Sequence, residues 1–222
     1  MAELRLTVDI VIFTVRERAL HVLLVKRGVP PFRGQHAIPG GFIHEGESLE
    51  DAAKRKLAEE AGVRDVYLEQ LYSFGDPHRD PRGRVITIAY YALVSSDDLS
   101  LVAGSDAAEA GWVPVSDLPP LAFDHRHILN YAVERLRNKL EYTTVGFQLL
   151  PEKFTLGQLQ AVYEAILGRP LDKRNFRRKI ALLKILKPLK EWQKTGRKPA
   201  QLFRFAAARF EKLKDKGILF PF

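Results

Sequence analysis

Residues 41–63, GFIHEGESLEDAAKRKLAEEAGV, hold the pattern that decides the fold of this 222-residue chain. Ser48 followed by Asp51 three residues later is typical of a helix start, and Gly62 is typical of a helix end. Positions 56, 59 and 60 are neighbours on such a helix, so carboxylates there would converge on one cation. Mg²⁺ prefers oxygen ligands and offsets charge on a diphosphate while a bound water attacks. The pattern therefore predicts a helix suited to metal and diphosphate chemistry.

Position 56 departs from this chemistry, because it holds a lysine where a third carboxylate is expected. The Lys56 ammonium would lie within reach of Glu59 and Glu60, where it fills part of the role of a metal and repels a second cation. General-base catalysis is worth ~10²–10⁴ in rate, so hydrolysis is expected to be weak or absent while a diphosphate still binds. The alternative is that Lys56 points to solvent and that Glu47, Glu59, Glu60 and a loop residue such as Glu109 suffice for hydrolysis.

The spacing of glycines, arginine and glutamates in residues 41–63 resembles the Nudix box, with Lys56 as the one departure. The resemblance implies an α+β fold, the Nudix α/β/α sandwich with a mixed sheet. No catalytic base is assigned, because members of the family differ in where their base comes from. The resemblance also implies a metal site, weak or vestigial in this chain, formed by the Gly40 carbonyl, Glu47, Glu59 and Glu60.

The remainder of the first 140 residues alternates between β-rich runs and turns. A loop rich in Gly and Pro, Gly28–Gly41, leads into the box, and the Pro119-Pro120 pair breaks the chain before a last helix. That helix is expected at Ile128–Leu140. The expected strands are Leu4–Phe13, Leu20–Val25, Val66–Phe74, Val85–Leu93 and Trp112–Val115.

Residues 67–94 are similar to the matching stretch of ADP-ribose-recognising Nudix domains, in which aromatic and arginine side chains frame the ligand. Phe74 is expected to stack on adenine, and Arg27 beside the Gly/Pro loop is a further phosphate candidate. The alternative for this region is a solvated turn that caps a hairpin. Three arginines of one loop are expected to grip phosphates: Arg79, Arg82 and Arg84.

The histidines give no signal of a metal site. His125 and His127 flank Arg126 beside the start of a helix, with no third ligand in view for zinc. His36 and His78 lie in loops near the box, and nothing in their spacing assigns them to a ligand.

Charge divides the chain into two parts. Residues 1–140 carry 17 Lys and Arg against 20 Asp and Glu (net −3), and residues 141–222 carry 18 against 7 (net +11), which together give +8. A basic C-terminal part predicts a polyanionic partner, because Lys and Arg that neutralise phosphates release condensed counterions. The alternative is a solvated basic surface that aids solubility.

The basic part has the pattern of a winged helix-turn-helix. Thr155 with Gln158 forms a capping box for a helix that closes at Gly168, and Asp172 starts a second, basic helix. Two β-rich runs around Thr195-Gly196 then predict a hairpin, the wing. The second helix would enter the major groove of DNA. A domain that merely docks against the first module is the alternative.

Candidate DNA contacts follow from residue type. Arg and Asn pair bidentately with guanine and adenine, so the expected base-reading residues are Arg174, Asn175 and Arg178. Other cations would hold phosphates and fix register without reading sequence. These are Lys173, Arg177, Lys179, Arg197 and Lys198.

The order of the modules and the sequence of residues 142–180 resemble the Nudix-related transcriptional regulators of NAD metabolism, the NrtR family, over nearly the whole chain. The resemblance implies a Nudix domain at 1–142 and a winged helix domain at 143–222. It further implies a homodimeric repressor of NAD synthesis or salvage genes that binds a palindromic double-stranded operator. ADP-ribose is the implied effector, although some relatives govern sugar genes. No cofactor is expected for DNA binding, and Mg²⁺ only if hydrolysis remains.

Two other functions stay open. One is a Mg²⁺-dependent ADP-ribose pyrophosphatase whose basic tail tethers it to nucleic acid. The other is an RNA-cap or RNA-processing enzyme, against which the lack of an aromatic ladder in the basic part counts.

The chain contains no cysteine, so disulfides and thiolate metal sites are excluded. Met1–Thr7 lacks a cationic segment followed by an apolar core, and no apolar run approaches the length of a membrane span. We therefore expect a cytoplasmic protein without a membrane partner.

Overall fold

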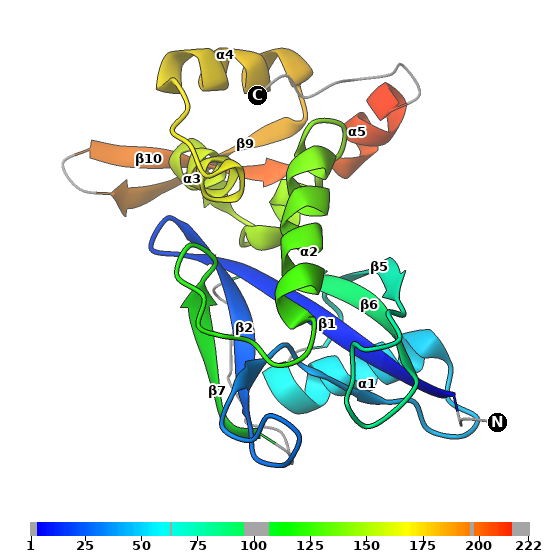
Figure 1. Cartoon of the computed structure of the whole chain (residues 1–222). Helices are drawn as coiled ribbons and strands as arrows, with labels where there is room; N and C mark the ends of the chain where they lie inside the picture. Colours follow the sequence, from blue (N-terminus) through cyan, green and yellow to red (C-terminus); the bar gives the residue numbers. More distant parts are fainter. Residues whose placement is uncertain (1–3, 63, 96–106, 196–197, 215–222) are drawn as a thin grey trace. The chain divides into compact units, whose positions relative to one another are not determined.

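The computed structural model describes residues 4–62, 64–95, 107–195 and 198–214. The chain forms two compact units. The first comprises Met1–Thr14 with Leu20–Arg135, and the second comprises Val15–Ala19 with Leu136–Phe222. Figure 1 labels the elements of both units, which are described separately below.

A mixed sheet forms the centre of the first unit, in the strand order β3-β2-β1-β6-β5, with β4 paired to β1 and β7 paired to β2. β1 and β6 are parallel, whereas the other pairs recorded for the described residues are antiparallel. This confirms the expected α+β fold with a mixed sheet. The strands are β1 (Arg5–Arg16), β2 (Ala19–Arg27), β3 (His36–Ala37), β4 (Gly40–Phe42), β5 (Tyr67–Phe74), β6 (Val85–Leu93) and β7 (Ala107–Pro114).

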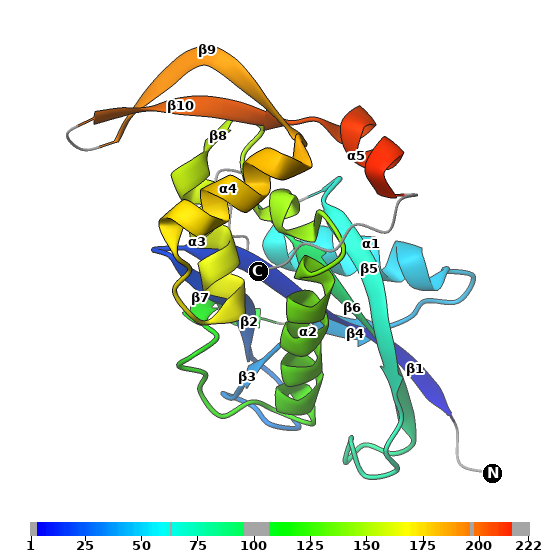
Figure 2. The same cartoon turned by 90° about the horizontal axis from the view of Figure 1, so that it is seen from above.

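Helices cover both faces of the sheet (Figures 1 and 2), which explains why residues 7–14 of β1 are all buried. Successive side chains of a strand point to opposite faces. Val8, Ile10 and Ile12 pack in one core with α1 (Leu49–Ala61). Val11 and Phe13, on the alternate positions, are fully buried too, and α2 (His125–Leu140) buries residues such as Ile128.

Local capping rules account for α1. The Ser48 hydroxyl accepts a hydrogen bond from the Asp51 N–H at 3.1 Å, and Gly62 closes the helix with φ 67°, a left-handed conformation that glycine adopts without strain. Both ends of this helix were predicted from the sequence and are confirmed.

Two elements extend further than expected. β7 begins at Ala107 rather than Trp112, and it pairs with β2 along its length. The added residues were missed because their sequence does not alternate between apolar and polar residues. α2 begins at His125 rather than Ile128. Its first turn was missed because that turn is polar and shows no apolar periodicity. The short strands β3 and β4 lie in the segment expected to be a loop.

The second unit has the helices and hairpin of a winged helix. Its elements are η2, a 3₁₀ helix (Val145–Leu149), β8 (Phe154–Thr155), α3 (Leu156–Leu167), α4 (Lys173–Leu183), β9 (Leu186–Thr195), β10 (Lys198–Phe205) and α5 (Ala207–Lys214). The small sheet has the order β8-β10-β9. Tyr163 of α3 packs edge-on against Phe176 of α4 at 5.5 Å between ring centres, and both are buried. These contacts join the two helices of the motif.

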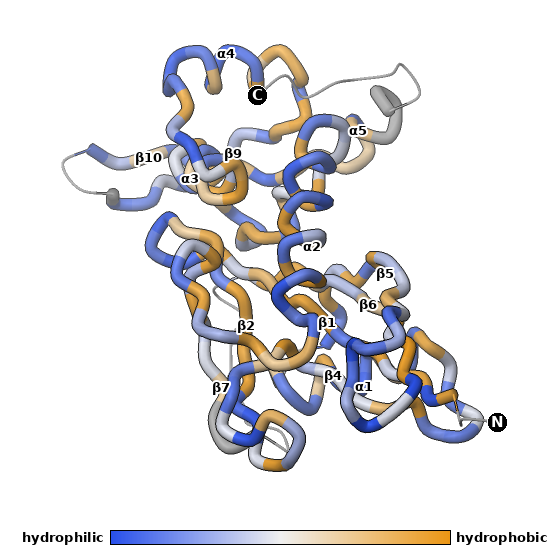
Figure 3. The backbone as a smooth tube through the Cα atoms, viewed as in Figure 1, coloured by the Kyte–Doolittle hydropathy of each residue, from blue (hydrophilic) through white to orange (hydrophobic). Residues whose placement is uncertain are grey.

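Hydropathy differs between a core strand and the basic helix. In Figure 3, β2 is largely hydrophobic and the first part of α4 is largely hydrophilic. The expected domain boundary at 142/143 stays a prediction. The compact units divide earlier, within α2, so that one continuous helix contributes residues to both.

The capping box of α3 yields a stability prediction. The Thr155 hydroxyl accepts from the Gln158 N–H at 3.1 Å, and the Gln158 side chain accepts from the Thr155 N–H at 2.8 Å. Replacing Thr155 by Ala should cost about 0.5–2 kcal/mol, because one orphan N–H of the helix loses its acceptor. Amide hydrogen exchange of α3 checks this. Thr155→Ser, which keeps the hydroxyl, is the control, and equal exchange in both variants would contradict it.

Candidate functional site

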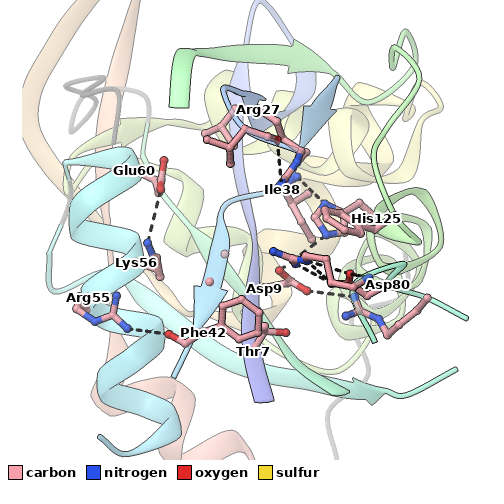
Figure 4. A pocket seen from close by; sticks show the side chains of 18 of the residues that line it. Thr7, Asp9, Arg27, Ile38, Phe42, Arg55, Lys56, Glu60, Asp80 and His125 are labelled. Atoms are coloured by element: carbon pink, nitrogen blue, oxygen red, sulfur yellow. Dashed lines mark hydrogen bonds and ion pairs between the residues drawn. The ribbon is translucent and has the colours of Figure 1, made fainter. Parts of the chain in front are cut away.

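A cavity of about 330 Å³ lies in the first unit, within the size range of small-molecule sites. Elements β1, β2 and β4, the box helix α1, the loop before β6 and the start of α2 contribute to its wall (Figure 4). Cationic side chains outnumber carboxylates among the described residues that line it, five to three. The cations are Arg27, Arg55, Lys56, Arg79 and Arg82, and the carboxylates are Asp9, Glu60 and Asp80.

The arginine of the box holds Glu47. Arg55 donates from Nε to one Glu47 oxygen at 2.7 Å and from Nη2 to the other at 2.8 Å. The backbone N–H of His44 adds a third bond to this carboxylate at 3.0 Å. The Arg55 hydrogen bonds, followed by that of His44, lower the pKa of Glu47 to about 2. Glu47 is therefore ionised and engaged by the protein itself.

Lys56 points into the cavity and not to solvent. Its side chain is 12% exposed, and its Nζ lies 2.8 Å from a Glu59 oxygen and 4.0 Å from a Glu60 oxygen. Figure 4 shows this ammonium directed at Glu60, beside Arg55, which reaches the carbonyl of Phe42. The solvent-facing alternative for Lys56 does not match this geometry.

The carboxylates of the box do not fit a divalent cation in this arrangement. Glu47 is bound by Arg55, and Glu59 is bound by Lys56 and also lies 3.4 Å from Arg55. Within the described part of the chain, no group of three or more His, Asp or Glu side chains is placed to hold a metal ion. Gly40, whose carbonyl was expected to join the site, pairs with Asp9 of β1. The implied metal site of Gly40, Glu47, Glu59 and Glu60 stays a prediction.

A buried ion-pair network forms another part of the wall. Arg79 donates to both Asp124 oxygens, at 2.9 and 2.7 Å, and to Asp9 at 3.3 Å. His125 Nδ1 accepts the Ile38 N–H at 3.1 Å, so its proton is placed on Nε2, which lies 3.8 Å from Asp9. Burial lowers the pKa of His125, which favours the neutral ring. Arg79 is thus fixed by two carboxylates from different elements.

Two further arginines lie over aromatic rings of the cavity. Arg82, paired with Asp80 at 2.7 Å, has its guanidinium 5.2 Å from the Phe42 ring centre and 5.4 Å from that of Phe123. The Arg27 guanidinium lies 4.8 Å from the Phe123 ring centre. Cation–π contacts of this kind position a guanidinium while leaving donors for an anion.

Not every expected ligand residue faces the cavity. Arg27, Arg79 and Arg82 line it, whereas Phe74 and Arg84 do not. Phe74 is 8% exposed, and it packs edge-on against side chains of α2, with Tyr131 at 5.8 Å. The Arg84 guanidinium donates to the Gly75 carbonyl at 2.5 Å and holds the base of the loop.

Several residues of the cavity, and Asp124 beside it, were not expected from the sequence. Asp9 had a detectable signal, since a carboxylate inside an apolar strand is rarely buried without a purpose. Asp124 and His125 had none, because their role depends on where the start of α2 meets Arg79 and β1. Phe42 and Phe123 resemble ordinary apolar loop residues in the sequence.

The exposed side of α4 carries the expected DNA contacts. Phe176 and Ile180 are buried on the inner side, and Arg178 donates to the Asn175 side-chain oxygen at 3.0 Å. Asn175 and Lys179 are half-buried, and Lys198 is exposed in β10. Arg197 lies outside the described residues. The exposed cations of α4 are Lys173, Arg174, Arg177 and Arg178.

Comparison with known proteins identifies a domain family in each of the two units. Residues 3–132 match the NUDIX domain, and residues 146–205 match the NrtR DNA-binding winged helix domain. The chain is 38% identical over 221 residues to the ADPR responsive transcriptional repressor NtrR of Acinetobacter baylyi, covering 97% of this chain and 85% of that protein. The chain belongs to the NrtR family.

Solved structures of the family match as well. Shewanella oneidensis NrtR complexed with a 27mer DNA has a TM-score of 0.82 and 38% identity, covering 93% of this chain and 95% of that one. The NUDIX domain of the same protein complexed with ADP ribose has a TM-score of 0.57 and 42% identity, covering 61% of this chain and 90% of that one. Among the described residues, no helix of this chain is long and apolar enough to cross a membrane.

The Arg55–Glu47 pair yields a pH prediction. Because the pKa of Glu47 is lowered to about 2, its contribution to stability is complete above its ordinary pKa of 4.5 and is lost as the pH falls from there towards 2. A ¹³C NMR titration of the Glu47 carboxyl should show ionised carboxylate at pH 4. Arg55→Gln should bring the titration back towards 4.5. A wild-type midpoint near 4.5 would contradict the pairing.

Proposed function

We propose that this protein is a transcriptional repressor that binds operator DNA through its winged helix unit and responds to ADP-ribose bound in the Nudix cavity. The observation that carries this is the Lys56 ammonium among the glutamates of the box, in a chain that also has a winged helix. Such a cavity retains diphosphate binding but lacks the carboxylate set of a hydrolase. Binding without turnover is what a sensor requires.

The cavity suits an ADP-ribose diphosphate. A diphosphate carries two negative charges, and guanidinium groups bind phosphate oxygens bidentately. Arg27, Arg79 and Arg82 are our proposed phosphate ligands, because all three line the cavity. The ADP-ribose-bound NUDIX domain of the Shewanella relative supports this choice of effector.

The second unit suits duplex DNA. Its net charge of +11 over residues 141–222, from 18 Lys and Arg against 7 Asp and Glu, favours a polyanion. Arg174, Asn175 and Arg178 are proposed to read base edges in the major groove. The Shewanella oneidensis relative solved in complex with a 27mer DNA supports DNA as the partner. Phosphate contacts are proposed for Lys173, Arg177, Lys179, Arg197 and Lys198.

We further propose a homodimer, because two recognition helices about 34–36 Å apart would read the halves of a palindromic site. The target genes would be those of NAD synthesis or salvage, as in the family. ADP-ribose must then bind more tightly to one DNA-binding state than to the other, since an effector shifts an equilibrium only through differential affinity.

Gel-shift titration tests the DNA assignment. The wild type should prefer a palindromic duplex from upstream of NAD-related genes over random duplex at moderate salt. Arg178→Ala should lose about 5- to 150-fold in affinity for that site, the equivalent of about 1–3 kcal/mol for one bidentate base contact. Arg64→Ala, which removes an exposed arginine from the first unit, is the matched control.

Two outcomes would contradict the proposal. One is equal affinity for the palindromic and random duplexes. The other is rapid Mg²⁺-dependent release of AMP from ADP-ribose by the wild type, which would instead support a pyrophosphatase with a nucleic-acid-binding tail.

A further inference from the structure

The stem of Lys56 is confined by the strand beside it. A Cβ on residue 41 would lie 2.5 Å from the Lys56 Cε, far inside van der Waals contact, and 3.3 Å from its Nζ, a tight contact. A side chain at position 41 would therefore require the lysine stem to shift, and glycine leaves room for the stem where it lies. With the ion pair to Glu59 at 2.8 Å, this packing fixes the ammonium at the cavity wall.

The box helix supplies its own positive charge. Arg55 offsets Glu47 and contacts Glu59, while Lys56 lies between Glu59 and Glu60. Two built-in cations thus take the two positive charges that a divalent ion would bring to the same glutamates. A further divalent ion would be repelled by the ammonium. Because the lysine side chain is mostly buried, water screens this repulsion only weakly.

We infer that the Lys56 ammonium replaces the divalent cation of this site, so that the effector diphosphate binds to the protein without any metal. This inference rests on the proposed function, in which ADP-ribose occupies the cavity. Lys56 acts here as a direct phosphate ligand, alongside the arginines of the opposite wall. An ammonium is a compact charge with three donors, and it can serve a phosphate and a carboxylate together.

Isothermal titration of the full chain with ADP-ribose tests the inference. The dissociation constant should agree within about twofold between EDTA and millimolar Mg²⁺. Lys56→Met keeps the stem but removes the charge, and it should weaken binding in EDTA about tenfold or more. Lys56→Glu should bind only when Mg²⁺ is present, because it restores a carboxylate to the box. Lys54→Met, on the exposed side of α1, should bind like the wild type.

The outcomes distinguish failure of this inference from failure of the proposed function. Wild-type binding that requires Mg²⁺ would overturn the inference and leave the proposed function standing. Failure of ADP-ribose to bind in either buffer would overturn both. Circular dichroism of Lys56→Met would show whether a weakened variant is folded, and Lys56→Glu provides a gain of metal dependence that misfolding cannot imitate.

A separate set of contacts involves β1 and α2 and bears on how effector binding could change DNA affinity. Arg79 joins Asp9 of β1 to Asp124, the residue before α2. Both β1 and α2 continue into the second unit along the chain. There, Arg18 after β1 pairs with Glu164 of α3 at 2.9 Å, and Arg137 of α2 donates to the Ile166 carbonyl of α3, also at 2.9 Å.

We propose that Arg79 is the positioning residue through which the effector alters DNA affinity. A phosphate that binds Arg79 competes with Asp9 and Asp124 for its donors and so changes the tie between β1 and α2. Arg18, two residues after β1, and Arg137 of α2 both contact α3, the first helix of the helix-turn-helix. Asp124 itself does not line the cavity, so its role can be tested apart from effector binding.

Linked binding measurements test this proposal with Asp124→Asn and with Arg137→Ala. Without effector, each variant should bind DNA within about twofold of the wild type. Arg137→Ala should bind ADP-ribose like the wild type, and Asp124→Asn should bind it at least as tightly, because the substitution removes a competitor for the Arg79 donors. The factor by which ADP-ribose changes DNA affinity should fall about fivefold or more, a large part of a typical coupling. Unchanged coupling in both variants would overturn the proposal. A purely structural role would alter stability without selectively removing coupling.

Discussion

An ammonium held 2.8 Å from Glu59 and 4.0 Å from Glu60 sets the character of the Nudix cavity. A family site that normally gathers carboxylates around a divalent ion here gathers them around fixed cations of the chain. The Glu47 carboxylate faces Arg55, and the Glu59 carboxylate faces Lys56. Among the described residues, five cations and three carboxylates line the cavity, which suits the diphosphate of the proposed effector.

The second constraint is the buried Arg79, whose guanidinium satisfies two carboxylates from separate elements. Removing one partner of such a network is costly, because a buried charge is left uncompensated. The network therefore joins β1 to the residue before α2, and under the proposed role of Arg79 a bound phosphate would compete for the same donors.

Elements governed by local rules could be predicted from the sequence. Ser48, Gly62 and Thr155 act within three or four residues of themselves, and the helices they cap lie where expected. Phe74 could not be placed, because its exposure depends on Tyr131, which is distant in sequence but packs edge-on against it. His125 was similarly hidden, since its proton position depends on a backbone N–H contributed by Ile38.

The second unit consists of two separate stretches of the chain, which limits where the chain can be truncated. Residues 15–19 comprise the end of β1, the turn after it and the first residue of β2, yet they belong with residues 136–222. A fragment that starts at residue 136 loses Arg18, the guanidinium beside Glu164, and one that ends at residue 135 cuts α2 next to the buried Leu136. A cut at this boundary divides α2 or separates Arg18 from Glu164, whereas single substitutions in the intact polypeptide leave both in place.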